Sequence, residues 1–433
     1  MPSASSDSHT VSLAGIDFSS SAELLLEQCE QLALISDMPG MVSRAYLTHE
    51  HAKCNDTVKT WIERDGLIAS QDQAGNILAT MPCENPDAPT LLLGSHLDTV
   101  PNAGKYDGIL GVLIGLEALH LAKRNNQRFP FNIVLIGFGD EEGTRFSSTL
   151  LGSRAVAGKW DKSWFDLSDK NDCRLDSALV DFGCDPDLIE TCSLASSALL
   201  GYLEVHIEQG PVLEDADLPL GVVTSIAGAK RVVVDIAGQA GHAGTVPMLL
   251  RQDALVTASE IILLVERTAH RYQVVATVGR IDCKPGAPNV IPGHCQFTID
   301  IRSGSNQTRD FALQSIHEEV QALVEARRVE MKWKEIYSAG AVKCAGWCQR
   351  LFETVINDMK LESLSLMSGA GHDAMSFASI TDVGMLFLRC KGGLSHHPDE
   401  SVTLEDTALS VEALYRALLK LRDDESFSSI TAR

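Results

Sequence analysis

The chain has 433 residues, of which 45% are hydrophobic and 22% are charged, and its 36 basic and 58 acidic side chains give a net charge of −22. This length favours two or three domains, and the composition is close to that of an average soluble globular protein. The acidic balance argues against nucleic acid or an anionic membrane as a partner, because both bind a basic surface, and no apolar run reaches the roughly 18 residues of a membrane span.

The first half of the chain carries the pattern of an α/β sheet. Its predicted elements are, in order, a helix at 22–34, strands at 66–69, 76–80 and 90–95, a helix at 111–124 and a strand at 132–138. Gly75 between the first two strands predicts a hairpin. The later two strands are short, continuous apolar runs bounded by glycine, as buried parallel strands are. The helix between them completes a strand–helix–strand unit, which predicts an α/β core.

After Gly221 the pattern changes to that of an α+β unit. The predicted elements are a strand at 231–236, a helix at 253–270, strands at 273–278 and 295–301, a helix at 309–327 and a strand at 329–336. This β-α-β-β-α-β order is that of a ferredoxin-like sandwich. Helices predicted at 346–359 and 404–421 return to the first unit. We therefore expect an α/β main domain with a central mixed sheet, built from 1–218 and 339–433, and an inserted domain at 219–338.

Polar side chains follow both buried strands of the main domain. The segment GSHLDTVP (94–101) follows the first of them, and GDEEG (139–143) follows the second. Ligand sites in α/β sheets gather outside the carboxyl ends of strands. His96 with Asp98 suits a metal-ligand histidine whose other ring nitrogen is held by a carboxylate. A hydrogen-bonded loop histidine has the same pattern.

The acidic segment has two interpretations. Three adjacent acids repel one another, so Asp140, Glu141 and Glu142 indicate either a solvated turn or a bound cation. Adjacent residues of an extended chain point in opposite directions. One glutamate can therefore bind a metal while its neighbour acts as a general base towards an activated water.

Two later segments add histidines. LEVHIEQGP (203–211) contains His206, and a half-buried strand with a polar face is the alternative there. GGLSHHPDE (392–400) places two adjacent histidines before a predicted helix. Such a set of nitrogen and oxygen ligands suits Zn or Mn, and five ligands with one shared carboxylate are what a two-metal site needs. The combined set is His96, Asp107, Glu142, His206 and one of His396 and His397, with Glu141 left unbound.

With these residues in place, the chain resembles the amidase/hydantoinase/carbamoylase branch of the M20 metallopeptidase superfamily. The resemblance runs from about residue 40 to about residue 420, and nine segments fall in family order. Each segment alone is modest evidence, whereas nine in order are specific. They are GSHLDTVPNAGKYDG, GDEEGTRF, HIEQGPVLE, GHAGTVPM, RQDA, NVIPG, DIRS, SGAGHDAM and SHHPDES.

The resemblance implies a two-metal hydrolase whose catalytic domain is the main domain. It places His96 and His206 on one metal ion and Glu142 and His396 on the other. Asp107 would bridge both ions. The ligands accept two divalent ions per subunit, with Mn or Zn the first choices and Co or Ni possible.

The resemblance also assigns the catalytic base to Glu141 and support of the neighbouring metal histidine to Asp98. A histidine at position 206, where the peptidases of the superfamily place a carboxylate, is similar to the amidohydrolase branch. His396 is preferred over His397 because the family pattern is Ser-His-x-Pro-x-Glu.

The inserted domain is implied to be a lid and dimerisation domain that completes the site by closing over it. His242 and Asn289 resemble groups that bind the scissile carbonyl or the substrate carboxylate, and His242 would also stabilise the oxyanion. Arg302 resembles an arginine that clamps the substrate carboxylate, a task suited to a bidentate guanidinium. Further substrate contacts are implied for Gln209, Gly371 and His372.

The expected reaction is hydrolysis of a ureido C–N bond in a small carboxylate, with release of ammonia and carbon dioxide. Allantoate is the first choice, and N-carbamoyl-L-amino acids, N-carbamoyl-β-alanine and ureidoglycolate are the alternatives. An M20 aminopeptidase or dipeptidase and a non-catalytic binding protein are the other classes. The resemblance implies a homodimer. The small polar N-terminus and the eleven scattered cysteines without a CxxC pair predict a cytoplasmic protein.

Overall fold

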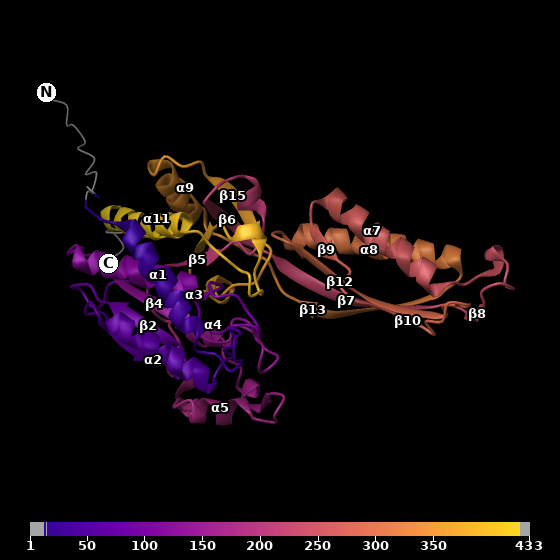
Figure 1. Cartoon of the computed structure of the whole chain (residues 1–433), viewed down its shortest axis with the longest axis horizontal. Helices are drawn as coiled ribbons and strands as arrows, with labels where there is room; N and C mark the ends of the chain where they lie inside the picture. The colour runs from indigo at the N-terminus through magenta and orange to yellow at the C-terminus, as the bar shows by residue number, and fades with distance from the viewer. Residues whose placement is uncertain (1–12, 14, 425–433) are drawn as a thin grey trace.

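The computed structural model describes residue 13 and residues 15–424, and its largest element is a sheet of nine strands (Figure 1). The strand order is β1-β2-β4-β3-β5-β16-β6-β14, and β15 also pairs with β6. The strands are β1 (Ile68–Gln71), β2 (Ile77–Met81), β3 (Thr90–His96), β4 (Asn132–Phe138), β5 (Leu199–Ile207), β6 (Leu220–Ile226), β14 (Val342–Lys343), β15 (Leu364–Ser368) and β16 (Val383–Leu388).

The centre of this sheet is parallel and its two margins contain antiparallel pairs. Neighbouring strands among β4, β3, β5 and β16 run parallel, whereas β2 pairs antiparallel with β4 and β6 pairs antiparallel with β16. The expected mixed sheet is therefore confirmed. Parallel strands end at the same edge, so the segments that follow β3, β4 and β5 meet there.

Most predicted elements of the first half are confirmed. The predicted strand–helix–strand unit is β3, α3 (Ile109–Arg124) and β4, and α3 is buried over nearly its whole length. The hairpin is β1–β2, with Gly75 at φ +77° in its turn. The predicted helix at 22–34 is α1 (Phe18–Ala33). Helix α2 (His49–Glu63) was not predicted from the sequence.

The strands β6, β15 and β16 were also not predicted, although β16 lies in the middle of the sheet. All six residues of β16 are buried, so the strand shows no alternation of buried and exposed residues. The alternative interpretation of 203–211 as a half-buried strand is correct in that 203–207 form part of a strand, but wrong in its burial. Residues 201–207 of β5 are buried throughout, including Glu204 and His206.

Helices cover the large sheet on both faces. One hydrophobic core joins the sheet to α1, α2, α3, α9 and α11, and a second core on the sheet includes α10 and the end of α4. Helices α9 and α11 confirm the two predicted at 346–359 and 404–421. Short helices such as α5 fill much of the stretch 159–200. The helices named here and not bounded above are α4 (Leu151–Val156), α5 (Leu175–Asp181), α9 (Gly346–Asp358), α10 (Ala374–Phe377) and α11 (Leu404–Asp423).

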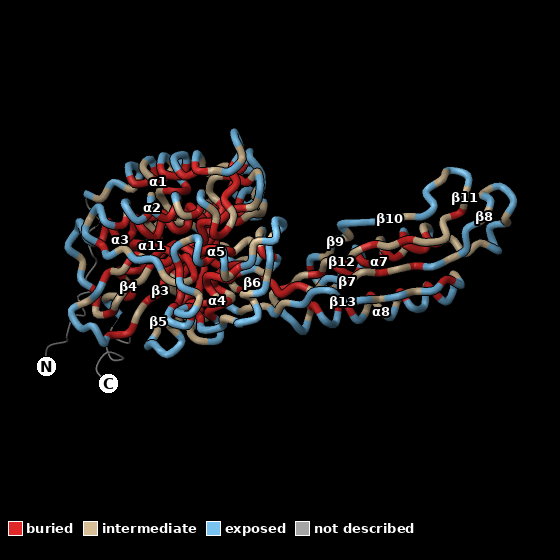
Figure 2. Tube along the Cα trace, turned by 90° about the horizontal axis from the view of Figure 1, so that it is seen from below, coloured by how far each residue is buried: buried red, intermediate tan, exposed pale blue. Residues whose placement is uncertain are grey.

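A second, antiparallel sheet projects from the larger body (Figures 1 and 2). Its order is β10-β12-β7-β13, and β9 pairs with the continuation of β12, so that β13, β7, β12 and β9 follow one another as in a ferredoxin-like sandwich. Helices α7 and α8 pack on it around a separate core. The elements are β7 (Gly228–Ala237), α7 (Ala254–Tyr272), β9 (Val275–Thr277), β10 (Ile281–Lys284), β12 (His294–Ser303), α8 (Asn306–Arg327) and β13 (Glu330–Ser338).

The alternation predicted for the strand at 295–301 is present. In β12 every second residue is buried, among them Phe297, Ile299 and Ile301, while Arg302 lies on the partly exposed face. The expected start of the inserted domain at 219 precedes β6. Because β6 pairs within the large sheet, the second sheet begins only at Gly228.

The far end of the second sheet carries a small two-stranded element. It pairs β8 (Gly241–His242) with β11 (Val290–Ile291), and the exposed apolar side chains of Met248, Leu249 and Leu250 lie in the connection that follows β8. Both views place this tip away from the larger body (Figures 1 and 2). Within the described residues no helix combines the length and the apolar character needed to cross a bilayer.

Candidate metal centre

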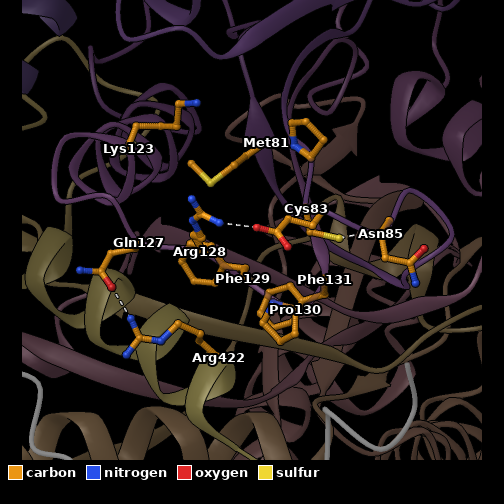
Figure 3. Close-up of a pocket in the computed structure, with 12 residues that line it drawn as sticks. Met81, Cys83, Asn85, Lys123, Gln127, Arg128, Phe129, Pro130, Phe131 and Arg422 are labelled. Atoms are coloured by element: carbon orange, nitrogen blue, oxygen red, sulfur yellow. Dashed lines mark hydrogen bonds and ion pairs between the residues drawn. The ribbon is translucent and has the colours of Figure 1, made fainter. Parts of the chain in front are cut away.

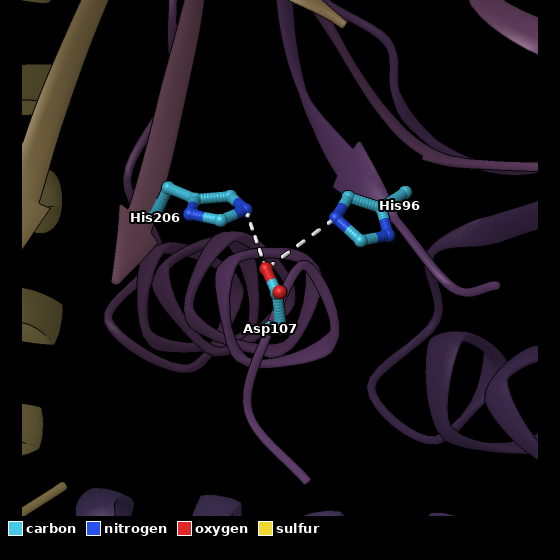
Figure 4. Close-up of side chains that lie close together, drawn as sticks. All are labelled: His96, Asp107 and His206. Atoms are coloured by element: carbon cyan, nitrogen blue, oxygen red, sulfur yellow. Dashed lines mark ion pairs between the residues drawn. The ribbon is translucent and has the colours of Figure 1, made fainter. Parts of the chain in front are cut away.

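Three buried side chains meet at the carboxyl ends of β3 and β5 (Figure 4). His96 is the last residue of β3, His206 lies next to the last residue of β5, and Asp107 lies just before α3. The Oδ1 atom of Asp107 is 3.2 Å from Nε2 of His206 and 3.7 Å from Nε2 of His96. One carboxylate oxygen therefore faces two imidazole nitrogens.

The other oxygen of the same carboxylate faces a second pair of residues. Nε2 of His396 is 3.1 Å from Oδ2 of Asp107 and 3.3 Å from Oε1 of Glu142. His396 comes from the loop before α11, and Glu142 comes from the turn after β4. The fold thus brings together the five residues for which we expect metal ligation.

The ring orientations leave lone pairs pointing at Asp107. Nδ1 of His96 is 3.0 Å from the carbonyl oxygen of Asp98, and Nδ1 of His206 is 2.8 Å from that of Ile207. A carbonyl oxygen only accepts hydrogen bonds, so in each neutral ring Nδ1 carries the proton and Nε2 presents a lone pair. Such lone pairs repel a carboxylate unless a proton or a cation lies between them.

A divalent cation fits these atoms. Oδ1 of Asp107 and Nε2 of His206 are buried and have no hydrogen-bond partner. Two groups of three residues share Asp107, and within each group the potential ligand atoms all lie within 4.8 Å of one another. The donors are imidazole nitrogens and carboxylate oxygens, which zinc and manganese accept. The two groups are His96, Asp107 and His206, and Asp107, Glu142 and His396.

The electrostatics agree with a place for positive charge. Burial alone would raise the pKa of Asp107, but the close imidazole groups of His206, His396 and His96 hold that pKa well below its usual value. The same contacts, with that to Glu142, raise the pKa of His396 to about 10. A bound cation would take the place of these protons.

Asp98 organises the acidic turn. Its Oδ1 accepts the N–H of Glu141 at 3.0 Å, and its Oδ2 accepts the N–H of Glu142 at 3.2 Å. It contacts His96 mainly through its backbone carbonyl, since its carboxylate lies farther away, at 3.8 Å from Nδ1. Burial, opposed by His96, raises the pKa of Asp98 to about 6. Burial, also opposed by His96, and the neighbouring carboxylates raise the pKa of Glu141 well above its usual value.

Backbone conformation also shapes the cluster. Gly108 has φ +70°, and a Cβ at this position would lie 2.3 Å from the His96 ring, so glycine lets the histidine pack against the start of α3. Asp140, Gln209 and His396 adopt φ values of +66°, +59° and +54°. This left-handed conformation is strained for residues with a side chain, and such strain is typical of functional sites.

The loop after β15 borders the cluster. His372 is buried beside His206, with ring centroids 4.5 Å apart, and its Nε2 is 2.7 Å from the Ser368 hydroxyl. A Cβ on Gly371 would lie 3.9 Å from Oε1 of Glu141. Both loop residues predicted to contact substrate therefore lie beside the expected ligands and base.

Arg302 approaches this loop from the second sheet. Its Nη1 donates to the carbonyl of Gly369 at 2.8 Å, and its Nε donates to Oδ1 of Asp300 at 2.8 Å. Gln209 donates from Nε2 to Oδ2 of Asp107 at 2.9 Å. Gln209 thus binds an expected metal ligand, and its contact with substrate stays a prediction.

The structure does not bring His242 and Asn289 to the cluster. Both are exposed at the tip of the second sheet, where the N–H of Ala243 donates to the carbonyl of Asn289 at 3.0 Å. Figures 1 and 2 show this tip at the far end of the molecule from β3 and β5. These two residues would need a movement of the second sheet, or a second copy of the chain, to reach a substrate.

Sequence reasoning missed three residues beside the cluster. Glu204 is buried in β5, where its Oε2 accepts from the Tyr202 hydroxyl at 3.0 Å and from the N–H of Ala374 at 3.1 Å. Its alternation with His206 could have indicated it. Ser395 and Glu400 lie within the segment SHHPDES, and both contact Asp107.

A cavity of about 780 Å³ lies elsewhere, at the opposite end of β4 from Glu142 (Figure 3). None of the expected site residues lines it. Arg128 pairs with Glu84, and Arg422 pairs with Gln127. The residues that line this cavity include neither a histidine nor a pair of acids, so we assign the cavity no chemistry.

Comparison with known proteins identifies relatives along nearly the whole chain. A family model described as Peptidase family M20/M25/M40 matches residues 92–420. An N-carbamoyl-L-amino-acid amidohydrolase of Pseudomonas sp. (strain NS671) is 36% identical over 406 residues, which cover 92% of this chain and 98% of that protein. Allantoate deiminase 1 of Glycine max is 36% identical over 408 residues, covering 87% of this chain and 84% of the relative.

Solved structures agree with the sequence relatives. The crystal structure of an amidase of the hydantoinase/carbamoylase family from Burkholderia multivorans superposes with a TM-score of 0.88. The two chains are 28% identical, and the match covers 93% of this chain and 98% of the other.

Proposed function

Because the chain belongs to the peptidase family M20/M25/M40, we propose that it is a metal-dependent amidohydrolase that cleaves a ureido C–N bond of a small carboxylate. The products would be ammonia and carbon dioxide together with the remaining amine. The observation that carries the proposal is the carboxylate of Asp107, whose Oδ1 is buried without a hydrogen bond between two imidazole nitrogens.

The cluster would hold two divalent ions. His96 and His206 would bind one, Glu142 and His396 the other, and Asp107 both. Two such ions lower the pKa of a water molecule and stabilise the negative charge that develops on the attacked carbonyl. Manganese and zinc suit these ligands best, and cobalt and nickel are compatible with them.

Glu141 would be the general base and later the general acid. It takes a proton from the attacking water and delivers that proton to the departing nitrogen. Two features support this role. Asp98 fixes its backbone N–H, and its carboxylate lies beside Gly371 in the loop that borders the cluster.

Substrate binding would combine the two sheets. Arg302 already lies beside the loop 369–372 and would hold the substrate carboxylate, with Asn289 as a second contact. His242 would stabilise the oxyanion. Since His242 and Asn289 are exposed at the tip, the inserted unit would act as a lid and as a dimerisation domain of a homodimer.

Allantoate is our first choice of substrate, and N-carbamoyl-L-amino acids are the second. Relatives of equal identity bear names of both kinds, which supports the shared ureido chemistry and both substrates. We disfavour a peptidase activity because this chain has a histidine, His206, at the position where the peptidases of the superfamily have a carboxylate.

The proposal is tested by ammonia release from manganese-loaded protein. Allantoate, N-carbamoyl-L-amino acids and N-carbamoyl-β-alanine are compared at equal concentrations, with dipeptides as a separate panel. Turnover of allantoate above the others supports the first choice. Turnover of a carbamoyl amino acid instead keeps the reaction and replaces the substrate. Dipeptide hydrolysis without ammonia from any ureido compound contradicts the proposal.

A further inference from the structure

The two oxygens of the Asp107 carboxylate have different surroundings. Oδ1 faces only His96 and His206, as described above. Oδ2 receives hydrogen bonds from the Ser395 hydroxyl at 2.7 Å and from Nε2 of Gln209 at 2.9 Å. Because a carboxylate oxygen with defined donors cannot rotate freely, these bonds hold Oδ1 towards the histidines.

Glu400 holds the same aspartate by its backbone. Its Oε1 accepts the N–H of Tyr106 at 2.8 Å and the N–H of Asp107 at 3.1 Å. Its Oε2 is 3.1 Å from the hydroxyl of Ser395. Glu400 therefore contacts Asp107 directly at the main chain and through Ser395 at the side chain.

The fold makes room for this contact. Glu400 is only 4% exposed, and a Cβ at position 104 would lie 2.2 Å from its carboxyl group, so Gly104 lets the side chain reach the turn. Burying a carboxyl group costs free energy unless its oxygens are hydrogen-bonded. Here the backbone amides of two residues provide those bonds to Oε1, while the Ser395 hydroxyl, whose single proton goes to Asp107 at the shorter distance, lies 3.1 Å from Oε2.

These contacts join the two parts of the chain that carry the cluster. Ser395 directly precedes His396, and Glu400 closes the same loop before α11. A displacement of this loop would therefore move His396 away from Asp107 and Glu142. The histidines of β3 and β5 do not depend on the loop.

We propose that Ser395 and Glu400 are positioning residues that orient the Asp107 carboxylate and hold His396 opposite Glu142. This inference rests on the proposed two-metal function. The pair would set the affinity of the ion held by Glu142 and His396 more than that of the ion held by His96 and His206.

The test is a calorimetric titration of metal-free protein with Mn²⁺. It measures the number of bound ions and their dissociation constants. We expect two ions in the wild type. In Ser395→Ala one ion binds 10 to 100 times more weakly, a range typical when a group that orients a metal ligand is removed, and the other, which shares Asp107, is weakened less. Glu400→Ala has the same effect or a larger one.

Two further variants separate positioning from general stability. Glu400→Gln keeps an acceptor oxygen for the two amides and can donate to Ser395, so it restores the second ion relative to Glu400→Ala. Glu208→Ala is the matched control, since Glu208 is a buried glutamate that accepts the N–H groups of Val212 and Leu213, each at 2.8 Å. It lowers the midpoint of thermal unfolding and leaves both ions bound with wild-type affinity.

The outcomes distinguish a failure of the positioning role from a failure of the proposed function. Two ions with unchanged affinities in both Ser395→Ala and Glu400→Ala overturn the positioning role and leave the proposed function intact. If Glu208→Ala weakens ion binding as much as Ser395→Ala and Glu400→Ala do, the effect is one of general stability, and the positioning role is again overturned. A wild-type protein that binds no ion overturns the proposed function, and this inference with it.

Discussion

Glu141 and Glu142 are adjacent in the chain and lie in different surroundings. Glu142 points at His396, at a distance of 3.3 Å, whereas the carboxylate of Glu141 lies near the position of Gly371, in the loop that borders the cluster. An oxygen of each carboxylate and a nitrogen of His96 nevertheless lie within 4.8 Å of one another, so both glutamates face the cluster, and the division of metal binding and proton transfer between them is our proposal.

At this scale we expect Glu141→Gln to retain both metal ions and to lose most turnover. A glutamine has nearly the same shape but cannot accept the proton of water, and loss of a general base slows reactions by about 10² to 10⁴-fold. Ammonia release and metal content are measured on the same samples. A variant with full metal content and turnover close to that of wild type would exclude Glu141 as the base.

The sequence indicated the side chains that the fold brings into the cluster, but not those that contact the cluster through backbone amides. His96 and Glu142 follow buried strands, so their positions at the end of a strand indicated them. Glu400 binds backbone amides, which carry no trace in a sequence, and its contact with Asp107 arises only when the two ends of the chain meet. The location of His242 at a distant tip depends on how the two sheets are placed, which local patterns do not encode.

At the scale of elements, β12 connects the second sheet to the cluster. Its alternation buries every second side chain against α7 and α8 and leaves Asp300 and Arg302 on the other face. Arg302 reaches the carbonyl of Gly369 from there, so the strand brings a cationic side chain to the loop 369–372 beside the cluster. Arg231 on β7 donates to the same Asp300, at 2.7 Å.

The pair Arg302 and Arg231 allows a matched comparison. We expect Arg302→Ala to raise KM by about 10 to 100-fold, the equivalent of about 1.5–3 kcal/mol for hydrogen bonds to a charged group. Arg231→Ala removes a cation from the same aspartate and is expected to change KM less than threefold. Metal content should be unchanged in both. Equal KM values for Arg302→Ala and the wild type would reject the carboxylate clamp.

The predicted elements were most accurate where a single pattern decided them. The strands at 90–95 and 132–138 have glycine boundaries and continuous apolar runs, and they were placed to within one residue. Strand β16 has the same apolar character but follows a short helix and a turn. Its place between β5 and β6 depends on pairings with distant strands.

At the scale of the whole molecule, the cluster gathers carboxylates in a chain that already carries a net charge of −22. Asp107, Glu141 and Glu142 lie within a small volume that includes three histidines. Bound cations would balance these charges and join the loop before α11 to the ends of β3, β4 and β5.

We therefore expect a chelator to abolish turnover and to lower the midpoint of thermal unfolding. An ion present at 100 times its dissociation constant stabilises the native state by about 2.7 kcal/mol. In domains of 150–250 residues a loss of 1 kcal/mol lowers the midpoint by about 2–4 °C. The control is the same chelator saturated with Mn²⁺, and re-addition of Mn²⁺ should restore both properties. An unchanged midpoint after verified metal removal would contradict a cluster held together by ions.

The position of β16 in the sheet has a consequence for folding during translation. On the ribosome β5 and β6 are released long before β16, which later inserts between them, and His396 follows only after β16. Until then each of the two strands has an unpaired edge, and such edges are templates for association with other chains. The nascent chain therefore keeps two exposed strand edges and an incomplete cluster until β16 and His396 have been translated. A message truncated before codon 383 would yield a product with neither a closed sheet nor a complete site, a natural target for chaperones and proteases.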